Sequence, residues 1–371
     1  MRQAYEFEKT YGELILRCSV CGFCQAVCPI YGLTRRPALN ARGKMLLLQE
    51  VMRGEMGLEQ DLVETLFQCT GCASCEVNCP SGVKVTEILR EVRREMVNTG
   101  TCHPVFTGMN EILAGSNNIY GETDPPEYLE GRKVNEKAAY VYFAGCVGAY
   151  REEEHTEVTL KLLDRMGVDY TLIDEVCCTG VLEEVGYAVH GSKAETLVER
   201  VRATGAETLI TGCPYCMRTF TSRNAYIGLS EAGVRVVHIS QFLSTMTFDV
   251  QTDLVVTYHD PCDLGRHAGI YEEPRRTIGR IAPRFVEMEH HHAQSLCCGA
   301  GGGVRASHPA HSIGMARRRL EEAEAVGADV VLTDCNSCVH NLSNAKLRRQ
   351  KLRITTVPAF ILSLLEGEER A

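Results

Sequence analysis

The stretch Cys18-Ser-Val-Cys21-Gly-Phe-Cys24-Gln-Ala-Val-Cys28-Pro29 decides the N-terminal fold, and it recurs as Cys69-Thr-Gly-Cys72-Ala-Ser-Cys75-Glu-Val-Asn-Cys79-Pro80. Both copies have the spacing C-x2-C-x2-C-x3-C-P. In such a run, three closely spaced thiolates bind one iron–sulfur cubane, and the fourth cysteine reaches the other cluster. Zinc fits poorly, because it prefers two C-x2-C pairs that make one tetrahedron. The duplicated spacing therefore predicts two [4Fe-4S] clusters.

The crossed ligand pattern divides the eight cysteines between two sites. Cluster one takes Cys18, Cys21, Cys24 and Cys79, and cluster two takes Cys69, Cys72, Cys75 and Cys28. Between and after the runs, Asn40 is expected to cap a helix, and apolar residues recur at helical spacing in 58–67 and 85–97. This part of the chain resembles helical ferredoxin modules, which carry electrons inside larger reductases. We expect residues 1–114 to form a helical 2x[4Fe-4S] ferredoxin domain.

Composition limits the kind of protein. The chain has 371 residues, 19 cysteines, no tryptophan and a net charge of −9. An odd cysteine count in a long chain without a signal-peptide pattern indicates ligands rather than disulfides. The acidic balance argues against nucleic acid as a partner, and no apolar run is long enough for a transmembrane segment. We expect a cytoplasmic protein, which a partner subunit could attach to a membrane.

The remaining cysteines form an internal repeat. A polar segment at 115–137, rich in Gly, Asn, Asp and Pro, is predicted to be a linker. Beyond it, the first copy has Cys146, Cys177-Cys178 and Cys213-Pro-Tyr-Cys216, and the second has Cys262, Cys297-Cys298 and Cys335-Asn-Ser-Cys338. Equivalent cysteines are offset by about 120 positions, which indicates a duplicated unit. Cys102 belongs to no motif.

Apolar, β-rich runs precede these cysteines. They cover 140–143, 208–211, 254–258 and 330–333, and helical patterns follow at 157–166, 193–204 and 311–325. Strands that alternate with helices predict α/β domains with mostly parallel sheets, whose sites lie past the carboxyl ends of the strands. The predicted fold class is α+β multidomain. An N-terminal helical ferredoxin domain is followed by duplicated α/β cysteine-rich domains, at 138–250 and 251–371, related by internal pseudo-symmetry.

The repeat resembles the cysteine-rich CCG domains of heterodisulfide reductases. The resemblance rests on the five cysteines of each copy and on His259-Asp-Pro-Cys262 and Cys297-Cys298-Gly299-Ala-Gly-Gly-Gly303. A ferredoxin module fused to a double CCG domain is similar to the D-type subunits of those enzymes. Thr179 departs from the family, which has glycine after the cysteine pair. We expect Thr179 to touch no ligand.

The resemblance implies the cofactors and the reaction. Each five-cysteine motif is expected to bind a noncubane [4Fe-4S] cluster, in addition to the two cubanes. The ten catalytic-site ligands are Cys146, Cys177, Cys178, Cys213, Cys216, Cys262, Cys297, Cys298, Cys335 and Cys338. The implied reaction is reduction of the coenzyme M–coenzyme B heterodisulfide to two thiols, a step of methanogenesis. The implied substrate is anionic.

Reduction of an anionic disulfide requires proton donors and anion-binding side chains, and we expect them beside the second motif. His259, Arg266, His267 and Arg305 are the candidates, and the Gly299–Gly303 loop lets backbone approach a cluster or an anion. The run His290-His291-His292 is predicted to be solvated surface. The run Arg317-Arg318-Arg319 is predicted to be the polar face of its helix or a docking patch for an acidic partner.

Two other functions stay open. The chain is alternatively the iron–sulfur electron-transfer subunit of a flavin-dependent glycolate, lactate or glycerol-3-phosphate dehydrogenase, or of a thiol:fumarate reductase. A zinc-stabilised interaction protein is the third class. For both redox functions, the disulfide reductase and the electron-transfer subunit, the expected partner is another electron-transferring subunit. For a disulfide reductase it is a membrane cytochrome b-type or a soluble flavoprotein donor.

Overall fold

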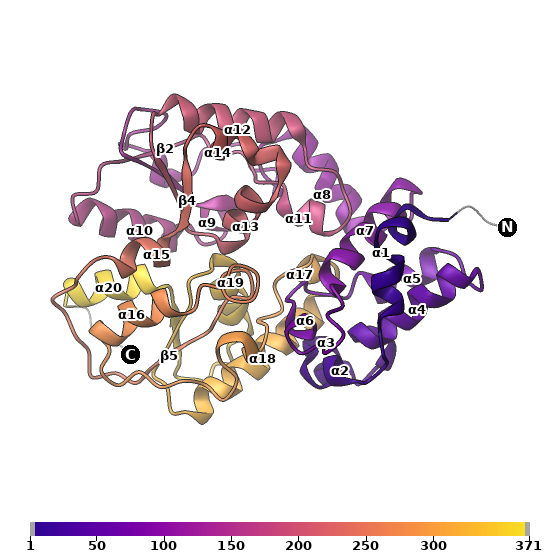
Figure 1. Cartoon of the computed structure of the whole chain (residues 1–371). Coiled ribbons are helices and arrows are strands. Elements are labelled where there is room, and N and C mark those ends of the chain that lie inside the picture. Colours follow the sequence, from indigo (N-terminus) through magenta and orange to yellow (C-terminus); the bar gives the residue numbers. More distant parts are fainter. Residues whose placement is uncertain (1–3, 368–371) are drawn as a thin grey trace. The chain divides into compact units, whose positions relative to one another are not determined.

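The cysteine runs and the β-rich runs belong to different structural units. The structure, a computed structural model, describes residues 4–367 and divides into two units (Figure 1). The first comprises residues 4–110, 181–188 and 296–316, and the second comprises 111–180, 189–295 and 317–367. Segments from both cysteine-rich copies therefore join the ferredoxin-like part in the first unit.

Helices and loops make up the first unit, whose described residues form no strand. Its helices are α1 (Glu6–Leu16), α2 (Phe23–Val27), α3 (Pro29–Thr34), η1 (Pro37–Leu39), α4 (Ala41–Arg53), α5 (Gln60–Leu66), α6 (Ser74–Val77), α7 (Val85–Asn98), most of α8 (Pro104–Gly115), most of α11 (Gly180–Glu184), α17 (Val304–Ser307) and the start of α18 (Pro309–Ala325). The Asn40 side chain accepts a hydrogen bond from Gly43 N at 2.8 Å, which confirms the predicted cap of α4.

Two parallel sheets organise the second unit. The four-stranded sheet has the order β2-β1-β3-β4, and the three-stranded sheet has the order β5-β6-β7. The strands are β1 (Tyr140–Phe143), β2 (Tyr170–Leu172), β3 (Thr208–Thr211), β4 (Arg235–His238), β5 (Val256–Tyr258), β6 (Val330–Leu332) and β7 (Arg353–Thr355). All pairings are parallel, as the alternation of strands and helices predicted.

Helices precede, connect and follow these strands. They are η2 (Glu127–Leu129), α9 (Gly145–Tyr150), α10 (Glu153–Arg165), α12 (Gly191–Ala203), α13 (Pro214–Ser222), η3 (Asn224–Tyr226), α14 (Ile227–Glu231), α15 (Ile239–Ser244), α16 (Glu272–Ile281), η4 (His292–Gln294), the rest of α18, α19 (Asn336–Ala345) and α20 (Val357–Leu365). Among residues 4–367, no helix is both long and apolar enough to cross a membrane.

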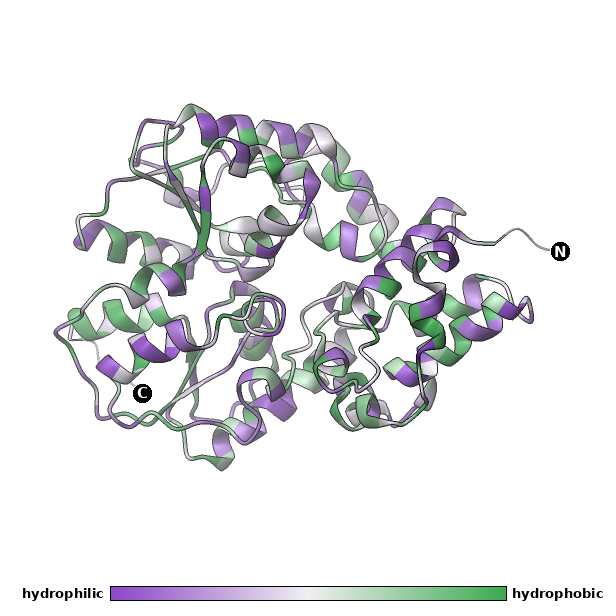
Figure 2. Cartoon of the chain, viewed as in Figure 1, coloured by the Kyte–Doolittle hydropathy of each residue, from purple (hydrophilic) through white to green (hydrophobic). Residues whose placement is uncertain are grey.

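One hydrophobic core joins the two sheets of the second unit. Tyr142 and Ile210 of the first sheet belong to the same buried cluster as Tyr258 and Leu332 of the second. Helix α20 is almost wholly buried, packs against α10 and α16, and is largely hydrophobic in Figure 2. Because α10 lies between β1 and β2 of the first copy and α16 lies within the second copy, α20 ties the two copies together.

A charged contact also links the copies. Glu152, before α10, lies 2.9 Å from His155 Nδ1 and 2.7 Å from Nδ1 of His340, which belongs to α19. Burial alone would raise the pKa of the Glu152 carboxyl, but hydrogen bonds to His155 and His340 outweigh burial and lower it from 4.5 to about 2. The ionised carboxylate therefore stabilises the folded unit.

We expect Glu152→Gln to lower the free energy of unfolding by about 1–3 kcal/mol at pH 7. Because the folded pKa is depressed, this stabilisation is present above pH 4.5 and is lost as the pH falls towards about 2. Urea unfolding of the anaerobically purified protein measures the effect. The exposed Glu154→Gln is the control, and equal stability of the two variants at pH 7 would contradict the prediction.

Candidate metal centres

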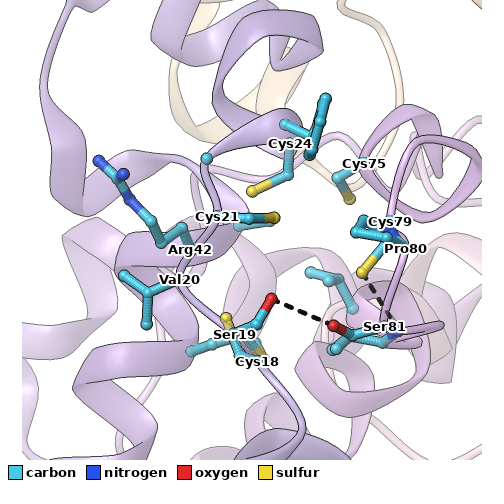
Figure 3. A pocket seen from close by; sticks show the side chains of 16 residues that line it. Cys18, Ser19, Val20, Cys21, Cys24, Arg42, Cys75, Cys79, Pro80 and Ser81 are labelled. Atoms are coloured by element: carbon cyan, nitrogen blue, oxygen red, sulfur yellow. Dashed lines mark hydrogen bonds between the residues drawn. The ribbon is translucent and has the colours of Figure 1, made fainter.

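The predicted ligands of cluster one surround one cavity. Cys18, Cys21, Cys24 and Cys79 line it, together with Cys75 (Figure 3). Val83 N donates a hydrogen bond to Cys79 Sγ at 3.4 Å, and the hydroxyls of Ser19 and Ser81 lie 3.2 Å apart across two loops of the site. Cys21 is exposed. Cluster one would therefore reach solvent on the Cys21 side.

The predicted ligands of cluster two surround a second, more enclosed cavity. Cys28, Cys69, Cys72 and Cys75 line it. Burial raises the pKa of Cys28 to about 12 and also raises the pKa of Cys69 and Cys75. Thiols buried in this way ionise only when a bound metal supplies positive charge. The cysteines of each predicted set line the same cavity, although Cys75 lines both, and the binding of a cluster in each cavity stays a prediction.

Two buried cations near cluster two were missed by sequence reasoning. Lys44 lines the cavity, is fully buried, and donates hydrogen bonds to Leu39 O and Gln68 O. Arg93 is also buried and donates through Nη2 to Cys69 O at 3.1 Å. Each cation occupies the apolar face of its helix, α4 or α7, and a cation on such a face is the signal that could have revealed it.

All five cysteines of the first motif come together in the second unit. Cys216 Sγ lies 3.3 Å from Cys178 Sγ. Cys177 interacts with Cys146 and Cys178, and Cys216 also interacts with Cys213. These interactions form a continuous chain through the five sulfurs. A cubane needs four ligands, so the site has one cysteine to spare.

Helix N-termini meet the cysteines of both C-x2-C pairs. Cys213 is the N-cap of α13, shortly after the end of β3, and Cys335 is the N-cap of α19, shortly after the end of β6. Cys216 and Cys338 lie in the first turns of the same helices. The free N–H groups and the dipole at a helix N-terminus stabilise negative charge. The fold therefore places helix N-termini, which can stabilise the charge of a metal-bound thiolate, at both C-x2-C pairs.

Thr179 behaves as the expected glycine would. Its φ is +59°, and its N–H donates to Cys177 Sγ at 3.3 Å. Gly299 of the second copy has a φ of +89° and donates to Cys297 Sγ at the same distance. The prediction that Thr179 touches no ligand is wrong, because its backbone hydrogen-bonds the ligand two residues before it.

The cysteines of the second motif divide between the units. Cys262, Cys335 and Cys338 lie in the second unit, and Cys297 and Cys298 lie in the first, where both are buried. In the first unit, Cys297 Sγ lies 3.6 Å from Thr70 Oγ1, within the second ferredoxin-like run. The structure thus brings Cys297 next to the loop that carries Cys69 and Cys72.

Within the second unit, the two motifs contact each other reciprocally. Arg218, two residues after Cys216, forms a 3.1 Å ion pair with Asp263, next to Cys262. On the other side, a Cβ at Gly148, two residues after Cys146, would lie 2.5 Å from Nδ2 of Asn336. The segment that carries the first cysteine of each copy, α9 in the first copy and the loop after Cys262 in the second, therefore packs against the C-x2-C helix of the other copy.

His259 has a fixed proton position beside the second motif. Arg319 Nε donates to His259 Nδ1 at 3.1 Å, so the neutral imidazole carries its proton on Nε2. A His259 ring nitrogen and Cys338 Sγ lie within 4.8 Å. Burial, and then the charge of Arg319, lower the pKa of His259 to about 3, so the ring is neutral. His259 is placed to donate a hydrogen bond towards cysteine sulfur.

The prediction for Arg319 is wrong. Its side chain is fully buried rather than on a polar helix face, and it also donates to Glu322 at 2.5 Å. Arg317 is exposed, as predicted. A buried arginine within an Arg-Arg-Arg run leaves no signal in the sequence, because all three positions have the same residue.

The other three candidate residues, Arg266, His267 and Arg305, lie in or near the loops around the second motif. Arg266 donates to Ala293 O and Ser295 O, which fixes the segment before Cys297. His267 and Arg305 are half-buried, and Arg305 lies on α17. The contact of His267 and Arg305 with an anionic substrate stays a prediction.

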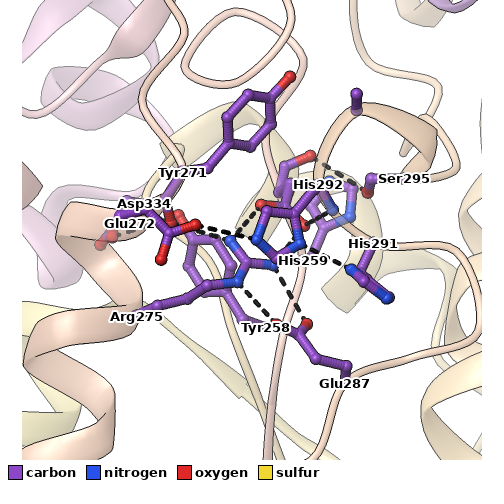
Figure 4. A network of polar contacts seen from close by, with 12 residues as sticks. Tyr258, His259, Tyr271, Glu272, Arg275, Glu287, His291, His292, Ser295 and Asp334 are labelled. Atoms are coloured by element: carbon purple, nitrogen blue, oxygen red, sulfur yellow. Dashed lines mark hydrogen bonds and ion pairs between the residues drawn. The ribbon is translucent and has the colours of Figure 1, made fainter.

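Arg275, which sequence reasoning missed, centres the polar network of Figure 4. It forms ion pairs with Asp260 and Glu287 at 2.7 Å each, and Asp260 also accepts from His292 N at 2.9 Å. Of the histidine run, His291 is exposed and His290 and His292 are half-buried. The network fixes Asp260, the neighbour of His259.

Family models match both parts of the chain. A 4Fe-4S dicluster domain matches residues 14–83, and a cysteine-rich domain matches 140–221 and again 256–343. With the cysteine geometry above, these matches define an iron–sulfur oxidoreductase with a dicluster module and two cysteine-rich segments.

Similar proteins of known family place the chain within the iron–sulfur oxidoreductases. The D-type subunit of a dihydromethanophenazine:CoB–CoM heterodisulfide reductase from Methanosarcina acetivorans is 31% identical over 365 residues, which cover 89% of this chain and 88% of that protein. The chain belongs to the family of heterodisulfide reductase D-type subunits. The B-type subunit of a fumarate reductase (CoM/CoB) from Methanothermobacter marburgensis is 29% identical, covering 78% of this chain and 58% of that protein.

A crystal structure of a hypothetical protein from Helicobacter pylori shares the fold. Its TM-score is 0.64 at 11% identity, and the match covers 98% of this chain and 76% of that one.

We expect Lys44→Met to lower the reduction potential of cluster two, because a buried positive charge favours the reduced, more negative cluster. The expected shift is on the order of 50–100 mV. Redox titration followed by electron paramagnetic resonance (EPR) measures it, with the exposed Lys9→Met as the control. A potential that is equal in the two variants would show that Lys44 does not tune the site.

Proposed function

We propose that this chain is the catalytic subunit of a disulfide reductase, and that its substrate is the coenzyme M–coenzyme B heterodisulfide. The observation that carries the proposal is the reciprocal contact between the two cysteine motifs. Arg218 and Asp263 join the motifs on one side, and Gly148 and Asn336 join them on the other. Two centres held against each other suit a substrate that separates into two sulfur fragments.

The proposed reaction balances simply. Two electrons and two protons enter, the S–S bond breaks, and each sulfur leaves as a thiol. Two cubane clusters would supply the electrons one at a time, and each five-cysteine motif would hold a noncubane [4Fe-4S] cluster. The complete set of five cysteines in both motifs supports this reading, because a centre that only conducts electrons needs four ligands.

The chain's own residues have distinct proposed roles. His259 Nε2–H donates a hydrogen bond to sulfur near Cys338, with Arg319 fixing its tautomer. His267 and Arg305 are proposed to contact the anionic groups of the substrate. Arg266 acts through the loop that it holds, since it donates hydrogen bonds to two backbone carbonyls of that loop.

The proposed partner is an electron-donating subunit, either a membrane cytochrome b-type protein or a soluble flavoprotein. The similar proteins are named as subunits of reductases, which supports a partner. Cluster one is the proposed point of entry, because Cys21 is exposed whereas Cys72 of cluster two is buried.

A second candidate is the electron-transfer subunit of a thiol:fumarate reductase or of a hydroxy-acid or glycerol-3-phosphate dehydrogenase. The similarity to the fumarate reductase subunit favours it. In that case the active site for the organic acid lies on another chain, and this chain only carries electrons.

Metal analysis and turnover distinguish these functions. The anaerobically purified protein should absorb broadly near ~400 nm and contain about 16 irons for four four-iron clusters. Its native complex should oxidise a reduced viologen dye when the heterodisulfide is added. A colourless zinc protein would overturn both redox functions. Turnover of a 2-hydroxy acid without heterodisulfide reduction would favour the second candidate.

We expect Cys298→Ala to abolish disulfide reduction, because the second motif loses a ligand, while the two ferredoxin-type clusters remain reducible. Viologen oxidation and EPR of the reduced protein measure the two effects. Cys102→Ala is the matched control, since Cys102 belongs to no motif and hydrogen-bonds Thr107 and Tyr187 instead. Retained activity in Cys298→Ala would exclude the second motif from catalysis.

A further inference from the structure

We propose that Thr70 is a positioning residue that couples cluster two to the second cysteine motif, so that this motif receives electrons first. The proposal deepens the proposed function and rests on it only in taking Cys69 and Cys297 as cluster ligands. It adds an order of electron flow, from cluster two through the Thr70 contact to the Cys297 side of the second motif.

The side chains of Thr70 and Cys297 meet in the interior of the first unit. The distance from Cys297 Sγ to Thr70 Oγ1 is 3.6 Å, and both residues are 4% exposed. A free Cys297 thiol donates to the hydroxyl. A metal-bound thiolate has no proton, so the Thr70 hydroxyl then becomes the donor.

Backbone packing holds the two ligand loops together. A Cβ at Gly302 would lie 2.1 Å from Cys69 O, and a Cβ at Gly301 would lie 2.5 Å from Thr70 O. Gly302 also has a φ of +59°, which favours glycine. The glycine-rich loop after Cys298 therefore admits the backbone of the cluster-two loop.

A buried arginine fixes the cluster-two loop from within the same unit. Arg93 donates to Cys69 O at 3.1 Å and to Leu66 O at 2.9 Å. Its Nη1 also donates to Glu184 O at 3.0 Å, at the end of α11. Because Cys69 O is held by Arg93 and covered by Gly302, Thr70 has little freedom to leave Cys297.

The hydrogen bond favours transfer in the productive direction. A donor to ligand sulfur stabilises the reduced, more negative state of a cluster and so raises its reduction potential. In the transfer step, one electron leaves cluster two, which is oxidised, and enters the second-motif centre, which is reduced. The proton stays on Thr70 Oγ1 throughout. No other reactant is needed.

The test compares Thr70→Val, which removes the hydroxyl at nearly constant volume, with Thr70→Ser, which keeps it. Thr65→Val makes the same change at a buried threonine of α5 in the same unit and is the matched control. Full-length protein is reduced anaerobically without substrate. EPR redox titration gives each potential, and rapid freeze-quench gives the rate at which the second-motif signal appears.

We expect Thr70→Val to lower the potential of the second-motif centre and to slow its reduction about fivefold, the factor that corresponds to one ordinary hydrogen bond. Thr70→Ser should restore both, and the first-motif signal should keep its potential. If Thr70 only filled space, Thr70→Val would leave both the potential and the rate of reduction unchanged, because valine has nearly the same volume.

Three results would overturn the proposal. One is a Thr70→Val protein whose second-motif potential and rate equal those of Thr65→Val. Another is a first-motif signal that appears before the second-motif signal in the unmodified protein. The third is failure of Thr70→Ser to restore what Thr70→Val loses. None of these readouts involves the disulfide substrate, so failure here is distinguishable from failure of the proposed function.

Discussion

Burial of thiolate ligands is the constraint on which the rest of this structure depends. A buried sulfur resists ionisation, as the pKa of about 12 at Cys28 shows, so each site must offer positive charge or hydrogen-bond donors. The chain meets this need in three ways. Helix N-termini meet the C-x2-C pairs, backbone N–H groups donate to Cys177 and Cys297, and Lys44 and Arg93 lie beside cluster two. Bound metal supplies the remaining charge.

The shared core of the second unit explains why the two motifs can act as a pair. Helix α20 and a common hydrophobic cluster hold the sheets of both copies together. The ion pair of Arg218 with Asp263 and the approach of Asn336 to Gly148 then set the motifs against each other. The proposed pairing of two centres relies on this packing, because separate domains on a flexible linker would not keep a fixed spacing.

The features that could be predicted from the sequence are those that depend on residues close together in the chain. The Asn40 cap, the strand Tyr140–Phe143, the parallel pairing and the gathering of eight cysteines around two cavities follow from spacing and periodicity. Sequence reasoning missed what depends on contacts across the chain. Thr70 and Cys297 are 227 residues apart, and no local pattern marks their meeting. Arg319 was misplaced for a related reason: helical spacing shows which residues share a face, but not whether an arginine on that face finds buried acceptors.

The loops after the two cysteine pairs show how duplicated motifs diverge. Thr179 and Gly299 have the same left-handed backbone and donate to equivalent cysteines, so this position alone does not require glycine. The next residues differ in what packs on them. A Cβ at Gly180 would meet the side chains of Tyr215 and Thr219, within its own copy, whereas Gly302 meets the backbone of the cluster-two loop. A side chain can turn aside, but backbone that carries cluster ligands cannot. The run Gly301–Gly303 therefore lets the backbone of the cluster-two loop approach the second copy closely, and the proposed electron transfer through the contact of Thr70 with Cys297 depends on that approach.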